Sequence, residues 1–476
     1  MATYETLKPL YEAAGQGHVF TFWDSLAQNE RTQLISALQD IDPARVNAIF
    51  KKATAPNAGA SASGAVEPVP PESVQSTLKA PAASIQAWRQ AGMKAIAEGK
   101  LAVILLAGGQ GTRLGSKEPK GCFDIGLPSG KSLFQLQAER IKKLQDLAAQ
   151  QAGGKACVIP WYVMTSGPTY AATVAFFEKH HYWGLEAKNV MFFNQGVLPA
   201  LTPDGKFLME TRYAPAVAPD GNGGIYAALE KQGVMADLER RGIPYVHCYC
   251  VDNCLVKVAD PVFVGYCIEK GAECGSKVVP KVDPHEQVGL LCRRAGKFSV
   301  LEYSEVSRED AEARGEDGAL RLHAANIANH FYTTDFLKRV SSLQGELEYH
   351  VAKKKVPHVD LNAGFSVAPE TKNGIKLELF IFDVFPFARS MAVLEVPRED
   401  EFSPLKNGAG SPDGDSPDTS RRDIFAQCAR WLAKAGATVA PDAAIELSPA
   451  VTYDGEGLDA AKGKTYSSEP TYVTAL

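Results

Sequence analysis

Apolar and polar positions along the chain follow two different periods. The chain carries four short continuous apolar runs, typical of strands buried on both faces of a parallel sheet: Leu101–Ala107, Val158–Met164, Val190–Phe193 and Tyr245–Val251. Between them, Ser132–Gln150 and Thr169–His180 repeat apolar residues at three- and four-residue spacing, which predicts helices. Strands that alternate with helices predict an α/β fold with a doubly wound, mainly parallel sheet and ligands at the carboxyl ends of its strands.

The flanking regions have other patterns. Residues 1–53 show helical spacing, and so does Ile85–Ala97. Residues 54–83 are rich in Ala, Pro, Ser and Gly, and we predict no regular structure there. Residues 407–420 are rich in Gly, Ser, Pro and Asp, which predicts a mobile loop. We therefore expect an N-terminal helical region with its linker over residues 1–98, a central domain over 99–398, and a small β-containing C-terminal domain over 399–476.

Composition and charge narrow the class of protein. The chain has 476 residues, of which 45% are hydrophobic and 22% charged, as in an ordinary soluble globular protein of two or three domains. A net charge of −5 gives no electrostatic reason to bind nucleic acid. Residues 1–10 lack the apolar core of a signal peptide, and no apolar run approaches the roughly 18 residues of a membrane span. We expect a cytoplasmic protein that binds neither nucleic acid nor membrane.

The nine cysteines do not form an evident disulfide or metal pattern. Cys248, Cys250 and Cys254 lie close together in sequence, which leaves a metal site open as one interpretation. No second Cys-x-x-Cys or paired histidine follows them, and the first two lie on an apolar strand. Buried thiols that act as small core residues are the favoured interpretation.

The region after the first apolar run has the features of a phosphate site. Gly108, Gly109 and Gly111 follow the strand directly, and glycines there bring backbone N–H groups close to a bound anion. Arg113 and Lys120 add positive charge to the same loop. The alternative is a glycine turn that only connects strand to helix, but the combination of glycines and cations favours a nucleotide phosphate site.

Two common phosphate motifs fail here by one residue. The dinucleotide fingerprint would need a glycine at position 114, where the chain has Leu114. The stretch from Gly126 to Ser132 has three residues between its glycines, where a Walker A loop requires four. What remains is Leu106-Ala-Gly-Gly-x-Gly-Thr-Arg-Leu-Gly115 followed by Pro119-Lys-Gly121, and it resembles the signature of sugar-nucleotide pyrophosphorylases.

Further motifs in a fixed order sharpen this resemblance. They are Gln195–Ala200, Ala218–Gly224, Val251–Asn253, Leu301–Ser304, Asn326–His330, Gly374–Lys376, Phe380-x-Phe-Asp383 and Phe402–Asn407. Together they resemble the eukaryotic UDP-N-acetylglucosamine pyrophosphorylases, up to about residue 407. The resemblance implies a central Rossmann-like (GT-A-like) nucleotidyltransferase domain with a mixed sheet, between an N-terminal helical part and a small C-terminal domain. It also implies a reaction in which UTP and N-acetylglucosamine 1-phosphate give UDP-N-acetylglucosamine, the precursor for chitin, N-glycans and GPI anchors, and pyrophosphate, with Mg²⁺.

The charged residues suit that chemistry. The attacking phosphate oxygen is already an anion, so the protein needs no general base, but it must align two polyanions and offset their charge. Arg113 and Lys120 are placed to do this, and the resemblance adds Lys376 and Lys406. Asp252 follows a buried strand, where a carboxylate can hold Mg²⁺; capping of the next turn is its structural alternative. Asp383 is a weaker candidate for a second ligand.

The remaining candidates concern nucleotide and sugar. The resemblance implies nucleotide contacts from Leu106, Ala107, Gly108, Gly109, Gln195, Gly221 and Asp252. It implies sugar contacts from Asn222, Gly289, Glu302, Tyr303, Asn326, Phe380, Phe382 and Lys406. By alternation, Phe380 and Phe382 share one side of a predicted strand over residues 379–384 and wall a recess for the acetamido methyl; sheet core is the alternative.

Two other functions stay open. A UDP-glucose or UDP-hexose pyrophosphorylase shares the glycine loop and the lysine. A binding protein that senses UDP-sugars without turnover is a different class, but binding alone does not need Arg113, Lys120 and Asp252 together. We expect a monomer or a weak homodimer.

Overall fold

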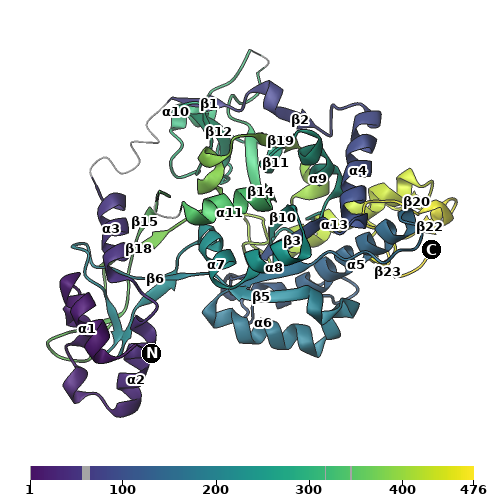
Figure 1. Cartoon of the computed structure of the whole chain (residues 1–476). Coiled ribbons are helices and arrows are strands. Elements are labelled where there is room, and N and C mark those ends of the chain that lie inside the picture. Colours follow the sequence, from purple (N-terminus) through teal and green to yellow (C-terminus); the bar gives the residue numbers. More distant parts are fainter. Residues whose placement is uncertain (1, 56–64, 317, 344–345) are drawn as a thin grey trace. The chain divides into compact units, whose positions relative to one another are not determined.

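The computed structural model describes residues 2–55, 65–316, 318–343 and 346–476 (Figure 1). The chain forms two compact units. The first contains residues 1–65, 195–228 and 342–384, and the second contains residues 66–194, 229–341 and 385–476. Helix α7 (Ile225–Lys231) runs from one unit into the other.

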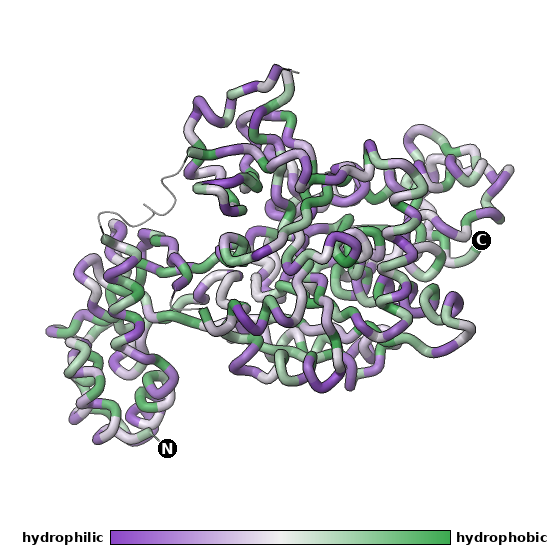
Figure 2. Tube along the Cα trace, turned by 45° about the horizontal axis from the view of Figure 1, so that its top comes forward, coloured by the Kyte–Doolittle hydropathy of each residue, from purple (hydrophilic) through white to green (hydrophobic). Residues whose placement is uncertain are grey.

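The first unit contains the predicted N-terminal helices: α1 (Tyr4–Ala13), α2 (Gln28–Leu38) and α3 (Pro43–Ala53). Asp42 begins α3 by accepting hydrogen bonds from the Ala44 and Arg45 N–H groups, which a helix start would otherwise leave unpaired. Hydrophilic and hydrophobic residues alternate along these helices (Figure 2), and the apolar face contains Tyr11 and Leu34. These side chains share a core with Phe207 and Leu377 from later parts of the chain.

Short two-stranded ladders complete the first unit. They are β6 (Val197–Pro199) with β9 (Val217–Pro219), β7 (Met209–Thr211) with β8 (Ala214–Pro215), β15 (His350–Lys354) with β18 (Gly374–Glu378), and β16 (His358–Val359) with β17 (Ser366–Val367). All four pairs are antiparallel. The chain connections between them carry several of the predicted site residues.

A large mixed sheet forms the centre of the second unit. Its main strands lie in the order β2 (Val74–Ser76), β19 (Met391–Glu395), β11 (Cys274–Pro280), β14 (Ala324–Thr333), β10 (Tyr245–Cys250), β3 (Leu101–Leu106), β4 (Trp161–Thr165) and β5 (Val190–Asn194). The sheet is extended by β12 (Leu290–Arg294), β13 (Lys297–Leu301) and β1 (Val66–Pro68). Strand β14 is antiparallel to both neighbours, whereas β10, β3, β4 and β5 are parallel. The predicted α/β fold with a mixed sheet is confirmed, although the sheet has as many antiparallel as parallel pairings and is not mainly parallel.

Helices of the second unit that bury apolar side chains include α4 (Ala82–Ala97), α5 (Leu133–Gln151), α6 (Gly167–Lys179), α8 (Val234–Arg241), α9 (Pro261–Glu269) and α11 (Thr334–Ser342). Two short helices, α10 (Arg308–Glu312) and α12 (Arg398–Glu401), bury no apolar side chain. Phe177 of α6, for example, contacts Phe134 of α5 and Trp161 of β4, with ring centroids 4.9 and 5.2 Å apart. All residues of β3 are buried, as its continuous apolar run predicts.

The C-terminal part of the second unit contains α13 (Pro417–Lys434) and two short parallel pairs. These are β20 (Thr438–Val439) with β22 (Thr465–Tyr466), and β21 (Ile445–Leu447) with β23 (Thr471–Val473). The expected β content is confirmed. The predicted range of the loop, residues 407–420, is too long at its C-terminal end. Ser416 caps α13, and the helix begins at Pro417.

The prediction that residues 54–83 lack regular structure is also partly wrong. Within it, β1 pairs with β12 and β2 pairs with β19, so both are edge additions to the large sheet. Backbone pairing with distant strands overrides the Pro-rich composition here. Residues 56–64 of that prediction lie outside the described part of the chain.

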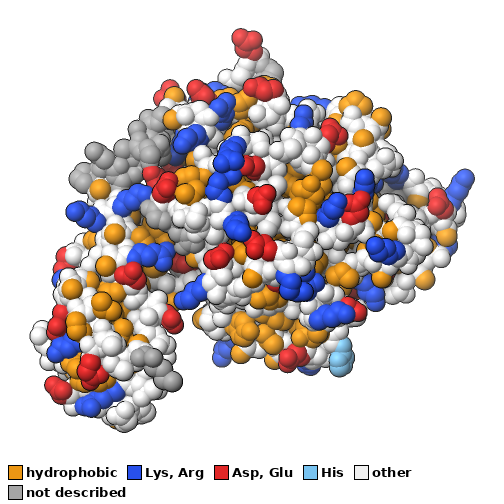
Figure 3. Space-filling model, in the orientation of Figure 1, with side chains coloured by type: hydrophobic (Ala, Val, Ile, Leu, Met, Phe, Trp, Pro, Cys, Tyr) orange, Lys and Arg blue, Asp and Glu red, His pale blue; other side chains and the backbone are white. Residues whose placement is uncertain are grey.

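Charges on the molecule are mixed in sign. The face shown in Figure 3 carries Lys and Arg side chains interspersed with Asp and Glu, in agreement with the small net charge of −5. Among the residues that the structure describes, no helix is both long enough and apolar enough to cross a membrane.

Candidate active site

The loop that follows β3 is fixed by main-chain contacts and still leaves open space. The Ala107 N–H donates to the Met164 carbonyl at 2.8 Å, and the Ser166 hydroxyl donates to the Gly108 carbonyl at 2.7 Å. The loop then turns back, so that the Lys120 N–H donates to the Gly109 carbonyl at 3.1 Å. A side chain at Gly109 would meet no atom within 4 Å. The backbone at Gly109 is therefore accessible to a ligand.

Lys120 and Asp252 come together at the carboxyl ends of neighbouring strands. Strands β3 and β10 are parallel, with Leu106 opposite Cys250, so the residues that follow each strand meet at one edge of the sheet. The Lys120 Nζ lies 3.7 Å from the Asp252 Oδ2 and donates to the Leu405 carbonyl at 3.2 Å. Both side chains are partly exposed, so the pair has access to solvent and to substrate.

The segment Phe402–Asn407 lies against this pair. The Leu405 N–H donates to the Asp252 carbonyl at 2.8 Å. The Lys406 ammonium forms an ion pair with Asp415 at 3.1 Å. Arg113 is exposed on the glycine loop, and the position of a Cβ at Gly408 would be 3.3 Å from the Arg113 carbonyl oxygen. The structure thus brings the glycine loop, Asp252 and this distant segment into contact.

A second cluster in the same unit contains half of the predicted sugar-binding residues: Gly289, Glu302, Tyr303 and Asn326. The Asn326 N–H donates to the Gly289 carbonyl at 2.9 Å, and a Cβ at Gly289 would lie 3.0 Å from the Glu302 Oε1. Gly289 and Glu302 stand at the open end of the β12–β13 hairpin, which joins β14 through Leu290 opposite Ala325. Tyr303 follows this hairpin and is half exposed.

The Asn326 side chain serves the protein as well as any ligand. Its carbonyl oxygen accepts from the Ala328 N–H at 3.2 Å, next to the left-handed backbone of Ala328 at φ 50°, where β14 departs from regular register. The same oxygen lies 3.2 Å from the His330 Nε2. Burial lowers the pKa of His330 to about 3, so the ring is neutral and donates through that nitrogen. The predicted acceptor of Asn326 is therefore already engaged, and its NH₂ group is left for a ligand.

Several other residues predicted to bind the nucleotide, the sugar or phosphate belong to the first unit. Gly221 has φ 87° and ψ 172°, and a Cβ there would lie 2.2 Å from the Leu379 carbonyl oxygen. The Asn222 Oδ1 accepts from the Ile381 N–H at 2.9 Å. Gln195 is half-buried, just after β5. Lys376 is half-buried on β18 opposite Ala352.

The predicted strand over residues 379–384 is wrong. Strand β18 ends at Glu378, and residues Ile381–Phe387 form a 3₁₀ helix. The cause is tertiary: the Phe380 N–H donates to the Asp383 carboxylate at 2.7 Å, and the neighbouring backbone bonds to the Asp220–Gly223 turn. Phe380 and Phe382 therefore do not alternate along a strand, although their rings pack together with centroids 5.3 Å apart. Phe382 is buried, and Asp383 is engaged with the backbone and with His350 at 3.2 Å.

The cysteines are arranged as buried core residues, and two polar groups near the glycine loop were not predicted. Cys248 and Cys254 are buried, and burial raises the pKa of the Cys254 thiol to about 11. In the described ranges, no group of three or more His, Cys, Asp or Glu side chains is arranged to hold a metal ion. The sequence did not predict that the Leu405 carbonyl accepts from the Lys120 ammonium or that the Ser166 hydroxyl donates to the Gly108 carbonyl. Neither residue type by itself indicates such a contact.

A mixed α/β sheet whose parallel strands deliver a glycine loop, a lysine and a carboxylate at one edge is the fold of the nucleotidyltransferases. Comparison with known proteins identifies the family. A family model described as UTP–glucose-1-phosphate uridylyltransferase matches residues 50–413, and the chain belongs to this family.

Relatives cover nearly the whole chain. It is 47% identical to a UDP-N-acetylhexosamine pyrophosphorylase-like protein 1 of Xenopus tropicalis, over 96% of this chain and 94% of that protein. It is 46% identical to the UDP-N-acetylglucosamine pyrophosphorylase of Saccharomyces cerevisiae, over 96% of this chain and 97% of the yeast protein. The crystal structure of the uridine diphosphate N-acetylglucosamine pyrophosphorylase from Trypanosoma brucei matches with a TM-score of 0.85 and 32% identity, covering 96% of this chain and 94% of that one.

Proposed function

We propose that this protein transfers UMP from UTP to N-acetylglucosamine 1-phosphate, giving UDP-N-acetylglucosamine and pyrophosphate. The names of the yeast and trypanosome relatives support this substrate over glucose 1-phosphate. The observation that carries the chemistry is the contact of Lys120 with Asp252 and the Leu405 carbonyl beside the open backbone of Gly109.

This arrangement suits an in-line displacement at the α-phosphorus of UTP. A phosphate oxygen of the sugar 1-phosphate forms a new bond to that phosphorus, and the bond to the bridging oxygen breaks, so that pyrophosphate leaves with the electron pair. The attacking group is an anion and gives up no proton. Lys120 offsets the negative charge that grows in the transition state, and Asp252 and Leu405 fix the direction of its ammonium. Arg113 adds a second cation from the same loop.

The other roles follow the family pattern. Leu106, Ala107, Gly108 and Gly109 contact the nucleotide, and Gln195 and Gly221 read uracil. Asn222 contacts both nucleotide and sugar, while Lys376 and Lys406 bind phosphate oxygens. Gly289, Glu302, Tyr303 and Asn326 hold the sugar, and the position of Gly289 against both Glu302 and Asn326 supports this assignment. Phe380 and Phe382 contact the acetamido group as a packed pair of rings.

Mg²⁺ fits the donor set. Asp252 offers one partly exposed carboxylate, a hard oxygen ligand, and Mg²⁺ is commonly held by one or two carboxylates together with substrate phosphates. Bound there, the ion would neutralise phosphate charge. A chelator should abolish turnover and leave the melting temperature of the ligand-free protein unchanged, because such an ion does not hold the fold together.

The compartment belongs to the same proposal. All nine cysteines are free thiols, which supports a reducing compartment, and we propose the cytoplasm. Fractionation of cells from the source organism, with antibody against the chain, tests this assignment.

Turnover of radiolabelled UTP with a panel of sugar 1-phosphates tests the function. Glucose 1-phosphate lacks the acetamido group, so it leaves polar groups of the site unpaired, and such a loss often reaches about 10²-fold. We expect a preference for N-acetylglucosamine 1-phosphate of at least about 10² in kcat/KM. Discrimination against N-acetylgalactosamine 1-phosphate should be weaker, because the epimer keeps that group. Equal use of glucose 1-phosphate would instead establish a UDP-glucose pyrophosphorylase.

A further inference from the structure

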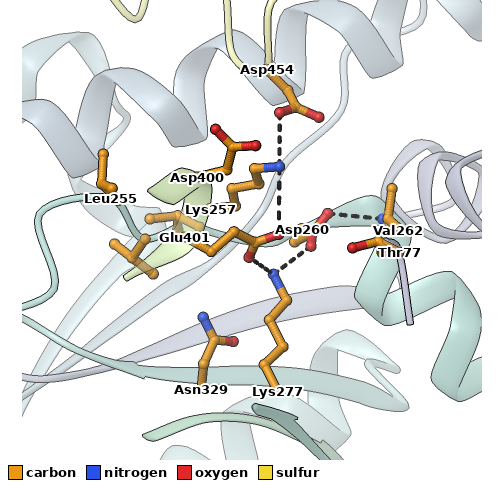
Figure 4. A network of polar contacts seen from close by, with 12 residues as sticks. Thr77, Leu255, Lys257, Asp260, Val262, Lys277, Asn329, Asp400, Glu401 and Asp454 are labelled. Atoms are coloured by element: carbon orange, nitrogen blue, oxygen red, sulfur yellow. Dashed lines mark hydrogen bonds and ion pairs between the residues drawn. The ribbon is translucent and has the colours of Figure 1, made fainter. Parts of the chain in front are cut away.

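A network of six charged side chains, three of them buried and three partly exposed, lies in the second unit, and the function described above does not use it. The buried ion network consists of Arg89, Lys257, Asp260, Lys277, Glu401 and Asp454, and Figure 4 labels all of these except Arg89. Its members come from α4, from the chain between β10 and α9, from β11, from α12 and from the C-terminal part. The network therefore joins segments that lie far apart in sequence.

Glu401 is held at both of its carboxylate oxygens. Lys277, whose side chain is completely buried, contacts the Glu401 Oε2 and also lies 2.5 Å from the Asp260 Oδ2. Lys257 lies 3.4 Å from the Glu401 Oε1 and 2.8 Å from the Asp454 Oδ1. Two cations on opposite oxygens prevent the carboxylate from turning, and they fix the end of α12.

The charges of the network balance, with three cations and three carboxylates. Arg89 completes the set by pairing with the Asp454 Oδ2 at 2.6 Å. Burial by itself would raise the pKa of Asp260, but the charges of Lys277 and Lys257 outweigh burial and lower that pKa below its usual value. Apolar side chains of similar size often stabilise a core as well as buried ion pairs do, so a stabilising role does not by itself account for the network.

A chain of hydrogen bonds leads from Glu401 to the candidate active site. The Glu401 carbonyl accepts from the Asn253 amide at 2.7 Å, and the Asn253 Oδ1 accepts from the Ser403 N–H at 3.0 Å. Two residues later, Leu405 donates its N–H to the Asp252 carbonyl and accepts from the Lys120 ammonium. The segment from Glu401 to Leu405 thus pairs with the residues after β10 and ends on Lys120.

We propose that Glu401 is a positioning residue, which the buried ion network fixes so that the Leu405 carbonyl holds the Lys120 ammonium in its reactive direction. The inference rests on the proposed function, because it assigns Lys120 to the phosphates of a nucleotide. Ion pairs suit this positioning role better than apolar contacts do. They fix the orientation of the Glu401 side chain, whereas apolar contacts would only keep it buried.

A charge-balanced double variant separates positioning from stability. Lys277→Met with Glu401→Leu removes one cation and one anion, and leaves two of each in the network. We expect a folded protein with a melting temperature below that of wild type, because the apolar pair fills the same volume but Asp260 loses its ion partner Lys277. We expect kcat to fall about 10-fold with KM for UTP changed by less than about 3-fold, because a misdirected Lys120 still meets the ground-state phosphates.

A double-mutant cycle with Lys120→Ala supplies a readout that a purely structural role would not move. Once the ammonium is absent, the network has nothing to direct, so the double variant should lower kcat by less than about 2-fold in that background. Glu273→Gln is the matched control: it breaks a partly buried ion pair with Arg339 in the same unit, and kcat should stay at the wild-type value.

Two outcomes would overturn the proposal. One is a folded double variant with wild-type kcat, and the other is an equal loss of kcat with and without Lys120. Should the double variant not fold, Glu401→Gln takes its place in the same cycle and is judged by the same outcomes. The cycle uses whichever substrate pair the wild-type protein turns over best, so the proposed function and this inference can fail separately.

Discussion

The loop after β3 and the turn at Gly221–Gly224 are both rich in glycine, but their glycines meet different surroundings. A Cβ at Gly109 would meet no protein atom within 4 Å, whereas a Cβ at Gly221 would lie 2.2 Å from the Leu379 carbonyl oxygen. Gly109 also lies outside the left-handed region, while Gly221 has a backbone conformation that is almost restricted to glycine. The first glycine leaves room for a ligand, and the second is required by the fold.

The charges differ in the same way. The loop after β3 presents partly exposed cations, Arg113 and Lys120, to solvent. The turn instead begins at Asp220, a buried carboxyl group whose Oδ1 has no hydrogen-bond partner within the described part of the chain. The first region has open space and exposed cations, and the second is shaped by close contacts and a buried carboxyl group. The predictions below test this contrast, from the largest expected effect to the smallest.

Loss of the Lys120 ammonium should have the largest effect. Lys120→Ala should lower kcat/KM by about 10²- to 10³-fold, because one oriented group leaves a charged transition state. Lys120→Arg should recover little, since a planar guanidinium does not replace a compact ammonium in a tight loop. Steady-state kinetics measures both, with Lys117→Ala on the same loop as a control expected to be silent. Near-normal turnover by the alanine variant would remove Lys120 from the site.

A methyl group at Gly109 should affect binding and not folding. Gly109→Ala should raise KM for UTP about 10- to 100-fold, because the methyl occupies the space that a nucleotide needs to approach the backbone. Its melting temperature should equal that of wild type, since no protein atom is displaced. Kinetics and thermal unfolding are measured on the same preparation. A marked drop in melting temperature would show that this glycine also serves the fold, and the contrast with Gly221 would fail.

The same methyl at Gly221 should damage the fold. Gly221→Ala should cost about 2–4 kcal/mol of stability, from the disfavoured backbone conformation and the contact with Leu379. Gly233→Ala is a control for positive φ alone, because Gly233 has φ 80° but no neighbour within 4 Å. Denaturant unfolding, with hydrogen exchange of the Gly223 amide that bonds to the Leu379 carbonyl, reports the loss. If both variants lose the same stability, the close approach of Leu379 is not the cause.

The buried carboxyl group of the turn should give the smallest effect, and one that depends on pH. Burial raises the pKa of Asp220 to about 6, although its own backbone N–H and Arg45 act in the opposite direction. Folding therefore favours the protonated form: its contribution to stability is fully present below the unfolded pKa of about 3.9 and is lost as pH rises through about 6.

Asp220→Asn removes this titration. Relative to the variant, the wild-type protein should lose about 1–3 kcal/mol of stability between pH 4 and pH 7, and no more above that range. Unfolding curves of both proteins across this pH range measure the difference. A difference that stays constant with pH would show that folding does not raise the pKa of the Asp220 carboxyl group.

Local sequence was sufficient wherever the signal and its cause lie in one segment. The run Leu101–Ala107 predicted β3 because a strand buried on both faces must be apolar at every position. The strand ending at Cys250 and the glycine loop followed in the same way, and Lys120 and Asp252 were each expected after a buried strand; the structure places the two side chains together. The family resemblance supplied Gly289, Glu302 and Asn326, which the structure places in mutual contact.

Other features were decided only by the tertiary structure. Lys120 contacts the carbonyl of a residue 285 positions away, and a main-chain carbonyl leaves no trace in residue type. The alternation at residues 379–384 predicted a strand, but this segment donates backbone hydrogen bonds to the Asp383 and Asn222 side chains, and residues 381–387 form a 3₁₀ helix. Apolar periodicity reports which side chains avoid water, and it cannot report which distant polar groups will bond to the backbone. For the same reason, the sequence did not predict that Lys257 and Lys277 pair with Glu401, and only the tertiary structure shows these contacts.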